Sequence, residues 1–356
     1  MLRVFVRRSS DVRYFTEDRA LEIEDLRDGP AGWWLRGEGD ATSERDVAGV
    51  LTSTKRSQVV GYDLVFAAPR PLSMLLALHP DHGSALVNAQ RRSVRAAMSY
   101  LEEHALVVRD RRSAEDRDVA ARWESAVGFT HGVNRHGDPH LHDHVLVGAR
   151  PADVELVLDA RALYAHSRAA DALYRTSLRY EVARRTPFQA QRTFHGVEVV
   201  AGLDEGYRAL WGGRHEARGE KRLWQRHEIV ERWRSDLERF QPFGGGVERT
   251  RASSQLDEHR FGSSLEGRRE VGRRHLVEAW SDAAITGHDP REVRASIESL
   301  YPELGSNRGV RETMIGVRQA RQTQLVSERG ARPLAYAELD AWRQRSRERS
   351  REGRSR

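Results

Sequence analysis

The sequence predicts an α+β fold, in which short strands precede or follow helices and an antiparallel hairpin lies in the middle. Two observations lead to this prediction: apolar extended runs flank stretches of helical periodicity, and a turn-rich segment joins two such runs near the centre of the chain. With 356 residues, 38% of them apolar, the chain can bury a sizeable core in one large domain or two ordinary ones. No run of about 18 apolar residues occurs, and the N-terminus has no apolar signal core. We therefore expect a cytoplasmic protein without a membrane segment.

The N-terminal part contains two predicted strands with a helix between them. Residues 2–6, LRVFV, form the first strand, and a serine or aspartate cap predicts a helix over residues 12–26 with Tyr14 in its first turn. Residues 59–68, VVGYDLVFAA, form the second strand, which is followed by two prolines. Asp63 is the single charge in that strand, and an isolated carboxylate costs free energy to bury without a partner. Asp63 therefore lies either on a solvated face or beside a partner.

Two predicted helices flank the central hairpin. Apolar residues recur with helical spacing over residues 84–105, and a short strand is expected at 106–109. The hairpin follows at 126–147, and residues 167–185 form the second helix. This order of elements supports the α+β class.

The composition changes after Pro187. Arginine-rich helical stretches such as residues 221–240 come first, and the GGG run, serine pairs and mixed charges that follow predict a flexible linker over 241–272. A small helical segment is expected at 273–340, and the arginine-rich tail at 341–356 is expected to be disordered. The tail either contacts nucleic acid or stays solvated.

Composition also limits the partners and the metal ligands. A net charge of +6 and a pI near 9.9 favour a polyanionic partner. Apart from Lys55 and Lys221 every basic residue is arginine, which suits phosphate contact and base stacking, although a GC-rich genome gives the same bias. The absence of cysteine excludes disulfides and thiolate metal sites, so histidines and carboxylates are the available ligands. The sequence contains neither GxxxxGK[ST] nor GxGxxG, so an ATP-driven motor within it is not expected.

Five of the fifteen histidines lie within residues 131–147, HGVNRHGDPHLHDHVLV. The Asn, Gly, Asp and Pro of this stretch predict a hairpin turn, and a turn centred near His136 places His131 opposite His142 on the partner strand. His142 and His144 share a face because side chains alternate along a strand. A His-x-His pair with a third histidine across the hairpin is a workable tridentate metal site. The spacing alone is equally compatible with a solvated, histidine-rich turn.

Four stretches, in the same order, resemble the conjugative relaxases of the MobF type, members of the HUH endonuclease superfamily. Tyr14 in DVRYFTED resembles their N-terminal catalytic tyrosine, and GYDLVFAAPRPLS at residues 61–73 resembles their GxDLTFSAPKSVS segment. FTHGVNRHGDPHLHDHVLVGAR at residues 129–150 resembles their F-x-H-x-x-S-R-x-x-D-P-x-L-H-x-H segment, and residues 158–185 resemble the helix that follows it. The resemblance covers most of residues 1–200.

The resemblance implies a fold and an activity. The fold is a relaxase domain over residues 1–240, with a central antiparallel sheet, flanking helices and helical fingers that form a lid at about 188–240. The activity is that of a metal-dependent, site- and strand-specific DNA nicking and joining transesterase. It acts at an origin of transfer through a 5′-phosphotyrosyl intermediate, in conjugative mobilisation.

The resemblance also selects among the histidines. It assigns a divalent metal ion to His131, His142 and His144, and it leaves His136 and His140 as bystanders. Members of the family are usually described with Mg or Mn, whereas three neutral imidazoles also suit Zn, Co or Ni.

Two further residues receive chemical roles from the resemblance. Tyr14 becomes the nucleophile, whose phenol needs a base or a nearby cation to react at neutral pH. Asp63 becomes the carboxylate close to the metal histidines, where it either orients a ligand histidine or accepts the tyrosine proton. Phe15 stands where family members often have a second tyrosine, so a second transfer by another tyrosine of the same protomer is not expected.

The implied partner is single-stranded DNA of an origin of transfer with an adjacent hairpin, together with accessory relaxosome proteins and a coupling protein. Arg70, Arg150, Arg161 and Trp224 are candidates for phosphate contact or base stacking. Two alternatives keep the same fold: an origin-binding module that does not cleave, and a related rolling-circle replication initiator. A third alternative, an unrelated histidine-metal hydrolase, would leave the four ordered matches unexplained.

Overall fold

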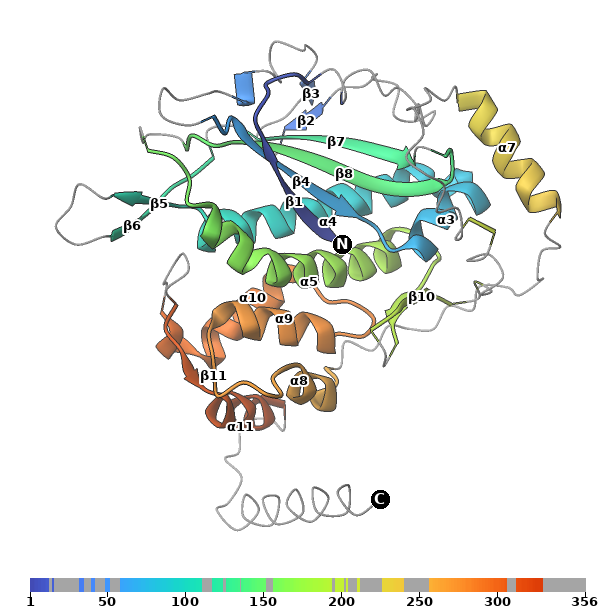
Figure 1. Cartoon of the computed structure of the whole chain (residues 1–356). Coiled ribbons are helices and arrows are strands. Elements are labelled where there is room, and N and C mark those ends of the chain that lie inside the picture. Colours follow the sequence, from blue (N-terminus) through green and yellow to red (C-terminus); the bar gives the residue numbers. More distant parts are fainter. Residues whose placement is uncertain are drawn as a thin grey trace.

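A six-stranded antiparallel sheet lies at the centre of the computed structural model (Figure 1). The structure describes residues 1–12, 15, 32–34, 40–41, 49–51, 58–110, 117–123, 126–134, 136–151, 156–193, 196–201, 203, 210–211, 226–239, 256–305 and 312–328. The strands follow the order β1 (Leu2–Arg7), β4 (Gly61–Ala67), β8 (Pro139–Gly148), β7 (Ala126–Val133), β2 (Gly32–Trp34) and β3 (Asp40–Ala41). The predicted α+β fold with a central antiparallel sheet is confirmed.

The turn between β7 and β8 sets the register of the hairpin. The side-chain oxygen of Asn134 accepts a hydrogen bond from the backbone N–H of His136 at 2.8 Å. Gly137 has a φ of 77°, a left-handed conformation that glycine adopts without steric cost. With this turn His131 pairs with His142, which is the register that the sequence predicts.

Helices cover one face of the sheet (Figure 1). They comprise α3 (Arg70–Leu78), the short helix η1 (Pro80–His82), α4 (Gly83–His104) and α5 (Ala160–Arg185). Tyr62, Leu64 and Phe66 of β4 are buried in the larger hydrophobic core together with apolar residues of these helices. The helix expected at residues 84–105 is therefore confirmed as α4.

Helix α5 begins earlier than its sequence periodicity predicts. It starts at Ala160 rather than at residue 167, because the Asp159 side chain accepts a hydrogen bond from the backbone N–H of Arg161 and caps the first turn. The added turns extend the helix that packs along α4.

The other face of the sheet carries a smaller hydrophobic core. It contains Val12, Phe15, Val50, Leu51, Val60, Val127, Phe129 and Leu146. Because side chains alternate along β8, the side chains of His142 and His144 lie on the same face as Leu146. The two faces of the sheet are therefore specialised, one for helix packing and one for the histidines.

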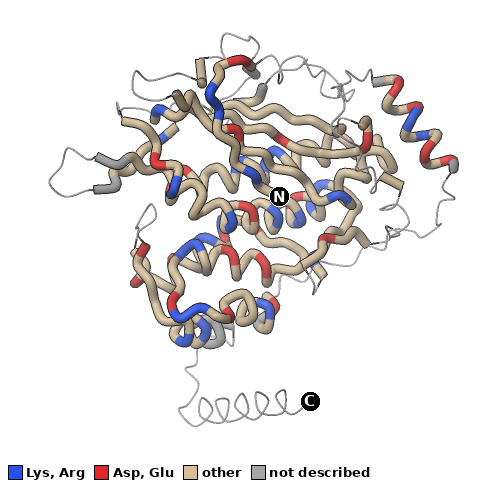
Figure 2. The backbone as a smooth tube through the Cα atoms, viewed as in Figure 1, with Lys and Arg blue, Asp and Glu red and all other residues tan. Residues whose placement is uncertain are grey.

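Short hairpins and one helix complete the part before residue 240. These are β5 (Val107–Asp110) with β6 (Arg117–Ala120), β9 (Ala190–Arg192) with β10 (Glu198–Val200), and α7 (Arg226–Arg239). Helix α7 carries both acidic and basic residues (Figure 2). The strand predicted at residues 106–109 is confirmed as β5.

The C-terminal elements pack against the helical layer. They comprise α8 (Glu258–Ser264), β11 (Glu270–Val271), α9 (Arg273–Ala283), α10 (Pro290–Leu300), η2 (Pro302–Leu304), β12 (Ile315–Gly316) and α11 (Val317–Glu328). Arg179 of α5 is buried, and it donates hydrogen bonds to the carbonyl oxygens of Ser281 and Ala284 and pairs with Glu198 at 2.7 Å. This buried arginine ties α9 to α5.

The prediction of a flexible linker over residues 241–272 is wrong for its second half. Helix α8 lies there, capped by Asp257, and Phe261 is buried 6.1 Å from the ring of Trp280. Glycine and serine content suggested a linker, but one aromatic anchor is enough to fix this segment on α9. Residues 241–255 and the tail at 341–356 lie outside the described residues.

Among the described residues, no helix is both long enough and apolar enough to cross a membrane.

Candidate active site

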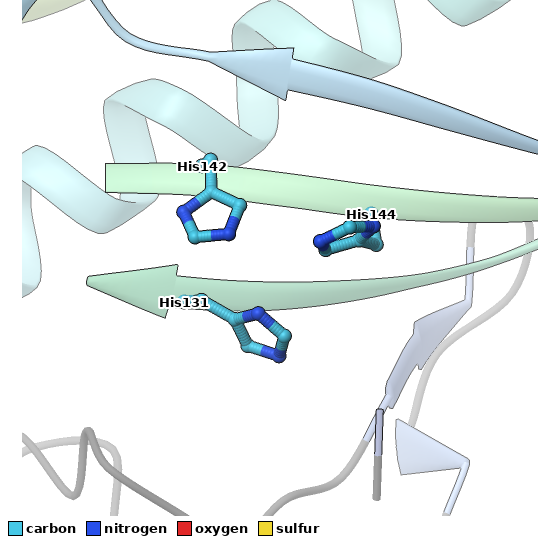
Figure 3. A group of neighbouring side chains, drawn as sticks. All are labelled: His131, His142 and His144. Atoms are coloured by element: carbon cyan, nitrogen blue, oxygen red, sulfur yellow. The ribbon is translucent and has the colours of Figure 1, made fainter. Parts of the chain in front are cut away.

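Three histidines converge on the face of the sheet away from α4 and α5. His131 comes from β7, and His142 and His144 come from β8. One ring nitrogen of each lies within 4.8 Å of the others, and the ring centroids are 5.1–5.3 Å apart (Figure 3). All three side chains are buried, with exposed fractions of 7–9%. The hairpin thus brings together the three histidines that the sequence selects.

Hydrogen bonds at Nδ1 orient two of the three rings. His142 donates from Nδ1 to the carbonyl oxygen of His140 at 2.8 Å. His144 donates from Nδ1 to Asp63, whose two carboxylate oxygens lie at 3.0 and 2.9 Å. A proton fixed on Nδ1 leaves the Nε2 lone pair available to a metal ion.

Asp63 is buried on the histidine face and has His144 as its partner. Asp63 pairs with Leu146 of β8, two residues along the strands from the pair formed by Val65 and His144. Of the two placements left open by the sequence, the structure contains the partnered one. Its carboxylate is engaged through both oxygens by one imidazole.

Electrostatics favour the neutral imidazole at His142 and His140. Burial and the neighbouring imidazoles of His140, His131 and His144 hold the pKa of His142 well below its usual value. Burial, with the charge of Arg70, lowers the pKa of His140 to about 4. A neutral imidazole is the form that binds a metal ion, so the site is prepared for one at neutral pH.

The donor set fits a divalent transition-metal ion. Three neutral nitrogens converge from two adjacent strands, and no thiolate is present in the sequence. Three-histidine sites leave further coordination positions for water or substrate.

A buried network supports the hairpin from the opposite face. Asp143, between the two β8 histidines, is fully buried and accepts hydrogen bonds from the Thr130 hydroxyl at 2.6 Å and from Trp33 Nε1 at 3.2 Å. Arg91 of α4 donates to the Thr130 hydroxyl at 3.0 Å. Sequence reasoning missed this group, although a charge in the apolar row of the predicted strand was a readable signal.

Tyr14 lies outside the described residues, but its neighbour Phe15 is described. The Phe15 ring is buried, 5.2 Å from the His144 ring and 5.5 Å from the Phe129 ring. The guanidinium of Arg7 lies 5.3 Å from the centre of the same ring. The residue after Tyr14 is therefore packed directly against one of the three histidines.

The predicted DNA-contact residues do not form one cluster. Arg70 is exposed at the start of α3, and its charge acts on His140. Arg150 is exposed two residues beyond the C-terminal end of β8, a ten-residue strand that is about 30 Å long. Arg161 is exposed and pairs with Asp159 at 2.6 Å, and Trp224 lies outside the described residues.

Helix α7 contacts the hairpin turn. Trp233 is buried and donates from Nε1 to the carbonyl oxygen of Gly137 at 2.8 Å, and Arg232 lies 3.6 Å from Asp138. The helix within the predicted lid region thus holds the turn that sets the histidine register.

Comparisons with known proteins identify a family for this chain. A family model described as TrwC relaxase matches residues 27–236. Curated proteins gave no match. The resemblance to conjugative relaxases is therefore confirmed, and the matched residues include three of the four stretches, whereas the stretch that contains Tyr14 precedes them.

Three solved structures have a similar fold, all of the conjugative relaxase TrwC in complex with oriT DNA. A metal-bound structure has a TM-score of 0.55 at 17% identity, a copper-bound one 0.53 at 18%, and a metal-free one 0.52 at 16%. Each comparison covers 70% of this chain and 100% of the other. At these identities the likeness concerns the fold.

Proposed function

The chain belongs to the TrwC relaxase family, and on that premise we propose that it is a metal-dependent, site- and strand-specific DNA nicking and joining transesterase. The observation that carries the proposal is the convergence of His131, His142 and His144 on one point, with Asp63 hydrogen-bonded to His144. Family membership implies a DNA-nicking enzyme, and this geometry supplies a place for its chemistry.

The three histidines would hold a divalent ion. The candidates are Mg and Mn, which the family resemblance implies, and Zn, Co and Ni, which suit imidazole ligands. When bound, such an ion binds the non-bridging oxygens of a phosphate and makes the phosphorus more electrophilic. The protein prepares the ligands: burial keeps the His142 imidazole unprotonated, and hydrogen bonds at Nδ1 fix the rings of His142 and His144.

Tyr14 is the proposed nucleophile. Its oxygen forms a bond to the scissile phosphorus while the bond from phosphorus to the 3′-oxygen of the preceding nucleotide breaks. The 5′ end remains on Tyr14 as a phosphotyrosine ester, the 3′-oxygen takes up a proton, and the phenolic proton passes to a base or to solvent. Because the ester conserves the bond energy, the reverse reaction reseals the strand without ATP.

Two neighbours support a reactive Tyr14. Phe15, the next residue in the chain, packs against His144 on the histidine face. Arg7 places its guanidinium over the ring of Phe15, the residue that follows Tyr14 in the sequence. The packing of the chain neighbour therefore favours a nucleophile next to the metal ligands.

Asp63 is proposed to orient His144 rather than to accept the tyrosine proton. Both of its oxygens lie within hydrogen-bond distance of His144 Nδ1, which fixes the tautomer that presents Nε2. A carboxylate engaged in this way strengthens the histidine as a ligand.

The proposed substrate is single-stranded DNA of an origin of transfer with an adjacent hairpin. The three relaxase structures of similar fold are complexes with oriT DNA. Arg70, exposed beside the histidines, is the predicted contact best placed for a phosphate, and α7 is proposed to form part of a lid over the site. Accessory relaxosome proteins and a coupling protein are proposed as further partners.

A cleavage assay separates this enzyme from an origin-binding module. The protein is incubated with Mn or Mg and a single-stranded oligonucleotide from the origin of its own mobile element, and a covalent adduct is sought after denaturation. We expect an adduct with the wild type and none with Tyr14→Phe. Tight binding of the correct DNA without any adduct would favour the binding module, and an undiminished adduct with Tyr14→Phe would exclude Tyr14 as the nucleophile.

A further inference from the structure

We propose that strand β1 carries a stacking subsite for single-stranded DNA, formed by Phe5 between Arg3 and Arg7. These three residues are called the β1 stripe. The inference rests on the proposed function and adds a substrate-binding element to it. It concerns bases next to the scissile phosphate rather than the phosphate itself.

The sheet register places the β1 stripe on the histidine face. Phe5 pairs with Asp63, and Arg3 pairs with Val65. Directly paired residues of adjacent strands point to the same side of a sheet. Since Asp63 reaches His144 on the histidine face, Phe5 lies on that face too, as does Arg3, two residues earlier.

The stripe lies close to the proposed metal ligands. Arg3 pairs with Val65, which pairs with His144, so Arg3 and His144 stand in one row of the sheet. Two strand spacings separate their backbones by about 10 Å. One nucleic-acid strand is long enough to contact both groups.

Phe5 has the exposure of a binding residue. Its side chain is 49% exposed on the outermost strand of the sheet, whereas the Phe15 and Phe129 rings on the same face are buried. An exposed aromatic ring between two arginines combines a surface for stacking bases with charges for the phosphates. The basic residues along β1 match the charge of a DNA strand (Figure 2).

Arg7 connects the stripe to Phe15, the residue that follows Tyr14 in the sequence. It donates a hydrogen bond to the carbonyl oxygen of Asp11 at 2.7 Å and lies over the ring of Phe15. A strand whose base stacks on Phe5 would therefore lead towards Arg7 and Phe15. The stripe would hold the substrate strand while cleavage occurs.

The test compares Phe5 with its neighbour Val6. Val6 is similarly exposed, at 43%, on the opposite face of the same strand, so Val6→Ala is a matched control for Phe5→Ala. The probe is a fluorescein-labelled dT20 oligonucleotide, and the readout is the Kd from anisotropy at fixed salt. Loss of one stacked base weakens binding by about 5- to 150-fold. We expect about tenfold for Phe5→Ala, less than twofold for Val6→Ala, and recovery with Phe5→Trp.

Arg3 gives a second readout. With Arg3→Gln we expect the slope of log Kd against log salt concentration to fall by about 0.7, the value for one phosphate contact on a single strand. An unchanged slope would remove Arg3 from the subsite.

Each failure points to a different part of the reasoning. If the wild type binds dT20 and Phe5→Ala binds equally well, the stacking subsite is wrong and the proposed relaxase stands. Equal losses in Phe5→Ala and Val6→Ala would show a general effect on β1 and would also overturn the subsite. A change of oligomeric state in Phe5→Ala with unchanged Kd would mean that Phe5 contacts another protein chain. If the wild type binds its origin oligonucleotide but not dT20, the stacking subsite is wrong and the proposed relaxase stands, whereas binding of neither DNA would count against the proposed function itself.

Discussion

Replacing Asp63 by alanine tests how the metal site is held. The change removes the acceptor of the His144 Nδ1 hydrogen bond while leaving His142 oriented by the carbonyl oxygen of His140. A hydrogen bond to a charged group contributes about 1.5–3 kcal/mol, which corresponds to roughly 10- to 150-fold in an equilibrium constant. Loss of a partner behind a metal histidine typically lowers affinity by about 10- to 100-fold. Because one of three ligands is affected, we expect Mn affinity to fall within that range without disappearing.

The assay is a calorimetric titration with Mn²⁺ on the wild type, Asp63→Ala and Asp63→Asn. Asparagine keeps an oxygen acceptor, so we expect it to lie between the other two. Asp81→Ala is the control, because Asp81 is an exposed carboxylate in the short helix η1. Thermal unfolding of each variant without metal shows whether the fold is intact.

One result would refute this role for Asp63. If Asp63→Ala binds Mn²⁺ with wild-type affinity but forms no covalent DNA adduct, the carboxylate acts on the tyrosine proton rather than on His144. Weaker Mn²⁺ binding together with less adduct, at an unchanged unfolding temperature, supports the orienting role.

Three further predictions concern the ligands, the network behind them and the C-terminal helices. We expect His142→Ala to lose metal binding and the covalent adduct while keeping most DNA affinity, whereas His136→Ala on the turn keeps all three; unchanged calorimetric metal affinity in His142→Ala would remove it from the site. Asp143→Ala leaves the buried Trp33 Nε1 and the half-buried Thr130 hydroxyl without their acceptor, so urea denaturation should give a free energy of unfolding lower by about 1–3 kcal/mol, and an unchanged midpoint would contradict a supporting role. Burial, with nearby arginines, lowers the pKa of His275 from 6.5 to about 4, so its contribution to stability is present above pH 6.5 and is lost as the pH falls towards 4. Because His275→Gln does not titrate and keeps an acceptor for the Gly272 N–H, its unfolding temperature should vary less between pH 6.5 and pH 4 than that of the wild type. Equal slopes of unfolding temperature against pH would disprove this role.

The histidine hairpin was predictable because its determinants are local. One short stretch of sequence contains both the turn residues 134–138 and the alternating residues of β8. Together they place His131 opposite His142. Choosing His144 as the third member also needed the family resemblance. No other part of the site is specified so completely by neighbouring residues.

The partner of Asp63 could not be read from spacing. Its contact with His144 depends on the pairing of β4 with β8, across 81 residues of sequence. Sequence shows that a carboxylate in an apolar strand needs a partner, but strand order decides which one it finds. The family resemblance placed Asp63 near the metal histidines, and the fold shows that its partner is Nδ1 of His144.

The wrong prediction of a linker up to residue 272 has a physical cause. Helix propensity and linker composition describe isolated segments, whereas α8 is fixed by tertiary packing of Phe261 against Trp280. The early start of α5 is different, because the capping residue Asp159 is visible in the sequence. At the start of α5 the capping residue therefore predicts the helix end better than the apolar periodicity does.

The most direct test of the account identifies the amino acid that carries the DNA. After reaction with a single-stranded origin oligonucleotide and Mn²⁺, the protein is digested with nuclease and trypsin, and the peptides are analysed by mass spectrometry. Cleavage at Arg13 and Arg19 releases YFTEDR, whose single tyrosine is Tyr14. We predict a nucleotide adduct on this peptide that disappears when the metal is chelated. An adduct on a different tyrosine, or a nicked product with no peptide adduct at all, would contradict the proposed attack by Tyr14 at the histidine site.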